Sequence, residues 1–145
     1  MRTVLVIDDN KSVRDSLRLL LQQRGYNGLV AESGAEGLAI AAQHVIDGAM
    51  IDVHMPGING VEVCRTLRDQ AVASGREIAL WVMTGARTPE LAKASLEAGA
   101  LELLGKPFDV ADLFRRFAER WGPPISTPPP TASPEVGVAG NEPVP

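Results

Sequence analysis

The chain has 145 residues, the length of one ordinary domain, and its composition of 45% hydrophobic and 22% charged residues is that of a globular protein. Its formal net charge of −4 argues against a nucleic-acid-binding protein, because phosphate contacts need clustered Lys and Arg side chains. The longest apolar runs are too short for a membrane span or a signal peptide, so we expect a cytoplasmic protein with no membrane contact.

Five short apolar runs divide the first part of the chain. They cover residues 3–7, 28–31, 48–51, 78–83 and 101–104. The runs "VLVI" and "IALWVM" are continuous rather than alternating, which is typical of strands that are covered on both faces.

The segments between these runs carry apolar residues at helical spacing. The clearest stripes are Val13, Leu17, Leu20 and Leu21, then Val61, Cys64, Leu67 and Ala71, then Val110, Leu113, Phe114, Phe117 and Trp121. Cys64, the only cysteine, therefore falls on a core-facing position and permits no internal disulfide. Because His44 and His54 lie far apart in sequence, the chain has no zinc-type spacing.

Several helix ends are marked by the sequence. Ser33 with Glu36 predicts a capping box, and Thr88 places a capping oxygen before a proline at the first helical position. Gly25 and Gly99 stand where helices should stop. Five strands and five helices in strict alternation predict an α/β fold, with a parallel sheet, right-handed crossovers and helices on both faces.

The composition changes sharply after Trp121. Residues 122–145 hold eight of the 11 prolines, mixed with Ser, Thr, Gly and Val. Such a segment buries too little apolar surface to offset the entropy of ordering it. We therefore expect one domain at residues 1–121, followed by a disordered, proline-rich tail or linker at residues 122–145.

Polar side chains follow four of the five apolar runs. Asp8 and Asp9 follow the first run, Asp52 the third, Thr84 the fourth and Lys106 the fifth. Taken singly, each has an ordinary explanation, since acids cap helices or turns and a lysine is usually solvated. In a parallel sheet, however, these strand ends meet at one edge, where ligands bind.

The three carboxylates together need a counter-charge. Two unit charges ~4 Å apart repel by about 4 kcal/mol at an effective dielectric constant near 20. A fold avoids such a cluster unless a cation and the lysine neutralise it. Because carboxylate oxygens are the hard ligands that Mg²⁺ prefers, the pattern points to a magnesium site.

Four segments, "VIDDN", "MIDVHMPGING", "VMTGA" and "LLGKPF", resemble in order and spacing the receiver domain of two-component response regulators. The resemblance covers residues 1–121 and implies a flavodoxin-like fold with strand order 2-1-3-4-5. It implies phosphorelay signal transduction by a phosphoprotein, which catalyses only its own phosphorylation and dephosphorylation. The implied partners are a histidine kinase or phosphotransfer protein and a downstream protein target.

By this resemblance, Asp52 is the phosphoacceptor, which attacks the phosphoryl group of a phosphohistidine. Asp9 is a direct Mg²⁺ ligand, and Asp8 holds the ion largely through water. Asp52 itself and the backbone carbonyl of His54 complete the metal site, whereas the His54 side chain has no assigned role. Lys106 offsets the charge on the transferred group.

The resemblance also assigns a switch. Thr84 matches a hydroxyl that moves to bond the phosphoryl group, and this movement alters the face formed by the fourth helix, fifth strand and fifth helix. The family usually couples the hydroxyl to an aromatic residue three positions before the lysine, where this chain has Leu103. Gly85 is a second departure. Pro107 matches a proline that follows a cis peptide bond.

Other classes of protein share part of the pattern. A haloacid-dehalogenase-type phosphatase also uses an aspartate and Mg²⁺, but it has a D-x-D pair where this chain has Asp8 and Asp9 adjacent. A flavin-binding module needs a hydroxyl- and glycine-rich phosphate loop at the same place. An inactive receiver, or a stand-alone receiver acting as a protein-interaction module, keeps the fold. The presence of all five site residues argues for an active receiver.

Overall fold

The computed structural model describes residues 1–122, in which strands and helices alternate without exception. The elements are β1 (Thr3–Ile7), α1 (Lys11–Gln23), β2 (Asn27–Ala31), α2 (Gly34–Gln43), β3 (Gly48–Asp52), α3 (Gly60–Ala73), β4 (Ala79–Thr84), α4 (Pro89–Glu97), β5 (Glu102–Gly105) and α5 (Val110–Trp121). The strands form one parallel sheet in the order β2-β1-β3-β4-β5, which confirms the predicted fold class and strand order. The predicted tail lies outside the described residues from residue 123 onward.

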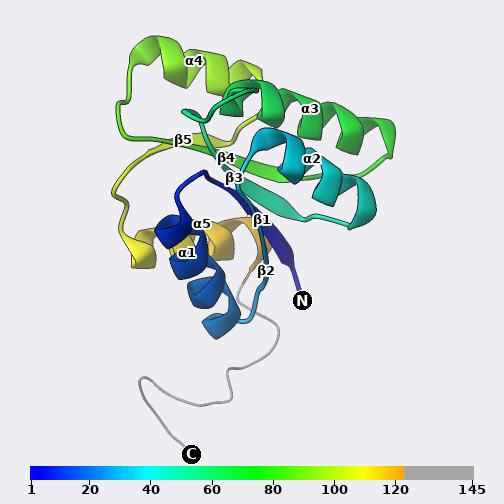
Figure 1. Cartoon of the computed structure of the whole chain (residues 1–145). Helices are drawn as coiled ribbons and strands as arrows, with labels where there is room; N and C mark the ends of the chain where they lie inside the picture. Colours follow the sequence, from blue (N-terminus) through cyan, green and yellow to red (C-terminus); the bar gives the residue numbers. More distant parts are fainter. Residues whose placement is uncertain (123–145) are drawn as a thin grey trace, which may run out of the picture.

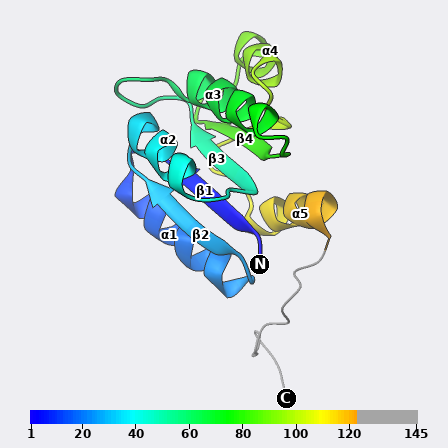
Figure 2. The ribbon, with the colours of Figure 1, turned by 90° about the vertical axis from the view of Figure 1, so that its right-hand side faces the viewer.

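Helices cover both faces of this sheet. The residues of α1 and α5 pack into one apolar cluster against the sheet, and those of α2, α3 and α4 pack into another on the opposite face (Figure 1). Figure 2 shows the same two layers from the side. Every residue of β3 and β4 is buried, as the continuous apolar runs predicted. No helix within residues 1–122 combines the length and apolar character that crossing a membrane requires.

The predicted helical stripes face these two clusters. Val61, Cys64, Leu67 and Ala71 are all buried on α3, and burial raises the pKa of the Cys64 thiol to about 11. On the other face, the Phe117 ring lies 5.1 Å from the ring of Trp81, measured between centroids. This aromatic packing joins α5 to the interior strand β4.

The predicted strand boundaries were wrong by one residue in four of the five strands, and in the last two strands the start was placed too early. The apolar runs placed them at residues 78–83 and 101–104, but β4 begins at Ala79 and β5 begins at Glu102. Leu101 extends the apolar run without belonging to the core, because 49% of its surface is exposed. Hydrophobicity alone therefore misplaced the start of β5.

The predicted N-caps at Ser33 and Thr88 are present, but the capping box at Ser33 is only half formed. The Ser33 hydroxyl accepts from the Glu36 N–H at 3.1 Å, although the Glu36 carboxylate accepts from the Glu32 N–H rather than from Ser33. Thr88 Oγ1 accepts from the Leu91 N–H, with Pro89 at the first helical position. Gly25 and Gly99 have φ of 85° and 106°, the left-handed conformation that glycine adopts without strain.

The aromatic packing between α5 and β4 should contribute strongly to the stability of the fold. Phe117→Ala should lower the free energy of unfolding by about 3–5 kcal/mol, because it leaves a cavity between α5 and β4. Chemical denaturation followed by circular dichroism measures the change. Leu19→Ala is the control, since Leu19 is 55% exposed and its truncation should cost no more than about 0.5 kcal/mol. Equal losses in the two variants would contradict the assignment of Phe117 to the core.

Candidate functional site

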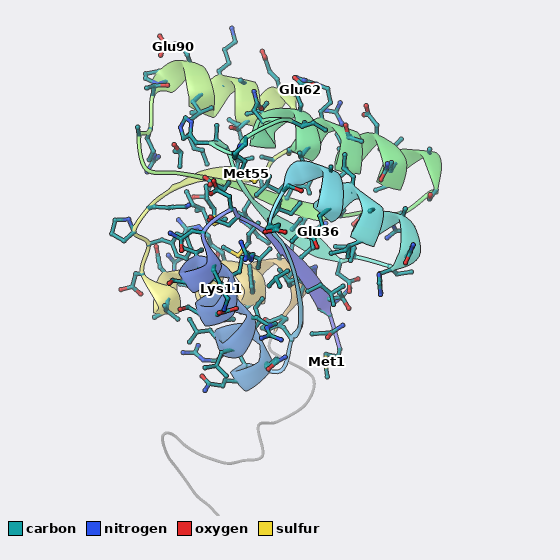
Figure 3. The ribbon with its side chains drawn as sticks, viewed as in Figure 1. Met1, Lys11, Glu36, Met55, Glu62 and Glu90 are labelled. Carbon is teal, nitrogen blue, oxygen red and sulfur yellow. The ribbon has the colours of Figure 1, made fainter. Side chains whose placement is uncertain are left out.

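The register of the sheet brings four strand ends to one edge. Ile7 pairs with Ile51 between β1 and β3, so Asp8 and Asp52 leave neighbouring strands at the same level. Thr84 ends β4 and pairs with Gly105, which immediately precedes Lys106. In Figure 3, Lys11 at the start of α1 and Met55 in the loop after β3 mark this edge. The polar residues predicted from the sequence therefore meet where the strands end.

Lys106 joins two of the carboxylates. Its Nζ lies 2.7 Å from Asp8 Oδ2 and 3.4 Å from Asp52 Oδ1. The Asp8 side chain is fully buried and that of Asp52 is 7% exposed, so both interactions act in a region of low dielectric constant. Removing Lys106 would leave the two buried carboxylates without a counter-charge, which is strongly unfavourable, whereas removing Asp52 leaves Lys106 paired with Asp8.

Asp9 adds a third carboxylate to the pair. Oxygens of Asp8, Asp9 and Asp52 all lie within 4.8 Å of one another. Against three negative charges the cluster has one ammonium group, which leaves it two charges short of neutrality. A donor set made only of carboxylate oxygens, with the exposed Asp9 open to water, fits a hydrated divalent cation such as Mg²⁺. The cluster could therefore bind a metal ion.

The electrostatics of the cluster are visible in two pKa shifts. Burial, reinforced by the negative charge of Asp8, raises the pKa of Asp52, while Lys106 and the His54 N–H oppose this shift. Burial acts to lower the pKa of Lys106, but hydrogen bonding and attraction to Asp8 and Asp52 outweigh it and raise that pKa. The ammonium group therefore stays charged at neutral pH, and Asp52 is the carboxylate whose ionisation the fold penalises.

Neither Asp8 nor Asp9 is used to cap α1. The N-cap is Asn10, whose Oδ1 accepts from the Val13 N–H at 3.1 Å. The Asp8 carboxylate accepts from the Asn10 N–H at 2.9 Å, and the Arg14 guanidinium donates to the Asp8 carbonyl at 3.0 Å. Sequence reasoning missed Asn10 and Arg14 as residues that hold this turn, although an asparagine directly before a helical stripe is a capping signal.

Gly60 fixes the position of Asp52. It is the first residue of α3, and a Cβ at this position would lie only 2.1 Å from the Asp52 carbonyl oxygen. Its N–H donates to the Val53 carbonyl at 3.1 Å, so the start of α3 rests on the end of β3. The structure therefore requires glycine at this position for the close approach of α3 to β3.

The remaining predicted residues lie around the cluster. His54 is exposed, and its backbone N–H lies 3.4 Å from Asp52 Oδ1. Thr84 is fully buried, and its Oγ1 accepts from the Ala86 N–H at 3.1 Å. Leu103 is buried in the apolar cluster beneath α3 and α4. The peptide bond between Lys106 and Pro107 is cis, as the resemblance implied. The metal role of the His54 carbonyl and the switch role of Thr84 stay predictions.

Residues 4–118 match the family described as the response regulator receiver domain. The chain is 38% identical over 114 residues to the response regulator MprA of Mycobacterium sp. strain KMS, which covers 79% of this chain and 48% of that protein. The same figures hold for the MprA of Mycobacterium avium strain 104. The chain thus spans about half the length of the curated relatives it matches.

Two solved structures extend the similarity to the fold. The chemotaxis protein CheY4 of Vibrio cholerae has a TM-score of 0.75 and 30% identity, with 82% of this chain and 98% of that chain covered. A CheY-like receiver domain protein from Methanospirillum hungatei JF-1 has a TM-score of 0.77 and 26% identity, with 83% and 93% covered. Nearly the whole of each receiver chain therefore overlays on the described fold.

The raised pKa of Asp52 makes its charge a cost to folding. Below the ordinary pKa of 3.8, folded and unfolded chains are both protonated, and the carboxyl group does not affect stability. As the pH rises through 3.8 and then through the raised folded value, the penalty grows to its full size. We therefore expect Asp52→Asn in EDTA to stabilise the protein at about pH 7 and to lose this advantage toward about pH 3.

Urea denaturation across this pH range measures the effect. Asp69→Asn is the matched control, because Asp69 is exposed on α3 and its replacement should change stability by less than about 0.5 kcal/mol. A neutral-pH loss of stability in Asp52→Asn would show instead that attraction to Lys106 outweighs desolvation.

Because α3 approaches Asp52 closely at Gly60, replacing this glycine by alanine should destabilise the protein, whereas the same replacement in an ordinary helix stabilises it. Gly→Ala in a helix ordinarily stabilises by about 0.5–1 kcal/mol, but Gly60→Ala should destabilise by roughly 1–3 kcal/mol because its methyl group pushes α3 from Asp52. Gly85→Ala is the control, since an added Cβ there meets nothing within 4 Å. Thermal and chemical denaturation measure both variants, and a stabilised Gly60→Ala would contradict the steric argument.

Proposed function

Because the chain belongs to the response regulator receiver domain family, we propose that it is a phosphorylation-dependent switch whose phosphoacceptor is Asp52. The observation that carries the proposal is the contact of one ammonium, Lys106, with both Asp8 and Asp52 inside a cluster of three carboxylates. We further propose that a histidine kinase or a phosphotransfer protein supplies the phosphoryl group. A cytoplasmic location and a division into a domain at residues 1–121 and a tail at residues 122–145 stay predictions.

The position of Asp52 suits a nucleophile. It ends a strand that is buried on both faces, and its backbone is held by the start of α3 at Gly60. An Asp52 carboxylate oxygen would attack the phosphorus of a phosphoimidazole, forming an O–P bond while the P–N bond breaks. The electron pair of that bond stays on the imidazole nitrogen of the donor, and the product on this chain is an aspartyl phosphate.

Lys106 supplies positive charge where the transfer needs it. Charge spreads over the equatorial phosphoryl oxygens during transfer, and a fixed ammonium beside the attacking carboxylate stabilises that distribution. Its bond to the fully buried Asp8 keeps the ammonium in place before any donor arrives. The chain itself therefore contributes positioning and electrostatic stabilisation.

The metal requirement follows from the same charge count. Asp8, Asp9 and Asp52, with the backbone carbonyl of His54, would hold Mg²⁺. The bound ion would supply Lewis-acid neutralisation of the phosphoryl oxygens. Since these carboxylates repel without a counter-ion, we propose that phosphorylation depends on a divalent cation.

Thr84 is the residue that would respond to the aspartyl phosphate formed at Asp52. Its buried hydroxyl lies at the end of β4, next to the strand that carries Asp52, and we propose that it bonds an oxygen of the aspartyl phosphate. The resulting movement would pass to the surface formed by α4, β5 and α5, where a downstream protein binds. Such a chain acts by changing conformation once per phosphorylation rather than by turning over a metabolite.

Phosphorylation by a small donor tests the proposal directly. Acetyl phosphate with Mg²⁺ should add the mass of one phosphoryl group to the wild-type chain, as measured by intact mass spectrometry. Asp52→Asn should gain nothing, because its amide is not a nucleophile. EDTA should slow labelling of the wild type by at least roughly 10²-fold, the scale of losing one electrostatic stabiliser.

Asp69→Asn is the matched control, since it removes an exposed carboxylate and should label like the wild type. A full mass gain in Asp52→Asn would refute the assignment of the phosphoacceptor. Labelling of the wild type at an equal rate in EDTA would refute the metal requirement alone.

A further inference from the structure

One arginine in the loop between β4 and α4 lies against the neighbouring strand. A Cβ built on Gly105 of β5 would lie 2.9 Å from Cδ and 3.5 Å from Cγ of Arg87. The aliphatic part of Arg87 therefore fills the space in which any other residue at position 105 would place its side chain. This contact needs both residues, because only glycine leaves the backbone of β5 open to it.

The contact lies next to the proposed switch. Gly105 pairs with Thr84 across the two strands and directly precedes Lys106 in sequence. The Lys106 N–H donates to the Thr84 carbonyl at 2.7 Å, which joins the strand ends at this point. Arg87 thus connects the β4–α4 loop to the β5 residue that lies beside both Thr84 and Lys106.

The Thr84 hydroxyl also bonds the backbone of this loop. Its Oγ1 accepts from the Ala86 N–H at 3.1 Å, and the hydroxyl lies 3.4 Å from the Ala86 carbonyl oxygen, its potential acceptor. A hydroxyl donates its single proton to one acceptor at a time. If Thr84 turns to a phosphoryl oxygen, Ala86 loses these bonds, and the residue that follows it, Arg87, loses its anchor.

Leu103, at the position where the family usually has an aromatic residue, has no side-chain hydrogen bond through which Thr84 could act on the loop between β4 and α4. It is 5% exposed, packs in the apolar cluster beneath α3 and α4, and has no polar atom to exchange partners. Arg87, by contrast, is exposed and is held by packing of its stem. A flexible side chain held in this way can leave at low cost, and Thr88, the N-cap of α4, follows it directly.

We propose that Arg87 is a latch, seated on Gly105 while Asp52 is unmodified and released when Thr84 turns toward the phosphorylated Asp52. Release uncovers the Gly105 backbone in a pocket of about 420 Å³ whose wall includes Glu102, Asp112 and Arg116. The wall of this pocket holds two arginines. Arg116 forms ion pairs with Glu102 at 2.7 Å and Asp112 at 2.8 Å. Arg87 forms no ion pair within the described residues, so it can move without breaking one. The inference rests on the proposed function, since phosphorylation is the signal that opens the latch.

Hydrogen–deuterium exchange of the full chain tests the latch, with peptides covering residues 85–91 and 103–108 as the readout. In the unmodified wild type, the seated arginine should keep exchange of these amides slow. Arg87→Ala removes the stem, and exchange in the loop should rise by about tenfold without any phosphorylation. Arg87→Met keeps most of the stem without the charge, so its exchange should stay within about twofold of the wild type.

A second variant tests the same contact from β5. Gly105→Ala displaces the Arg87 stem and should give the same rise in exchange as Arg87→Ala. The double variant should rise no further than either single variant, because both remove one interaction. In the wild type, acetyl phosphate with Mg²⁺ should raise exchange of the same peptides, whereas phosphorylated Arg87→Ala should gain less than about twofold.

The outcomes separate the latch from the proposed function. Unmodified Arg87→Ala exchanging like the wild type would overturn the latch, whatever phosphorylation does. Additive effects of Arg87→Ala and Gly105→Ala would also overturn it. Absence of a mass gain in the wild type would refute the proposed function, while the comparison of unmodified variants would still decide whether Arg87 holds the loop.

Discussion

The bond between Lys106 and the two buried acids is the interaction on which the rest of this site depends. Three carboxylates, two of them buried, have oxygens within 4.8 Å of one another and repel, and one ammonium balances only part of that charge. The raised pKa of Asp52 shows that the fold holds this residue at some cost. Such a cluster does not favour stability, and its charge is consistent with the proposed binding of a cation and the proposed phosphoryl transfer.

Contacts from the starts of α1 and α3 hold the carboxylate cluster in place despite the repulsion between its charges. Asn10 caps α1 so that the Asp8 carboxylate is left to bond Lys106, and Gly60 lets α3 start directly on the Asp52 carbonyl. The loop after β4 is held by the Thr84 hydroxyl and by packing of the Arg87 stem on Gly105. In the proposed mechanism, the contacts of Asn10 and Gly60 position the reacting groups, whereas the loop after β4 changes when Asp52 is phosphorylated.

Much of the fold was predictable from local patterns. The continuous runs predicted doubly covered strands, the periodic stripes predicted the buried faces of α1, α3 and α5, and Ser33 and Thr88 marked helix starts. The polar residues at strand ends also identified the candidate cluster, because the ends of parallel strands meet at one edge. Local apolar character misplaced the start of β5 by including Leu101, since hydrophobicity does not reveal which apolar residues reach the core.

By itself, the sequence determined which residues could meet, because periodicity fixes the elements and their alternation fixes a parallel sheet. Only the tertiary structure decided how they meet. It paired Lys106 with Asp8 more closely than with Asp52, brought Gly60 against the Asp52 carbonyl, and placed the Arg87 stem on Gly105. These contacts join segments far apart in the chain, and their distances depend on strand register and helix packing, which no local pattern encodes.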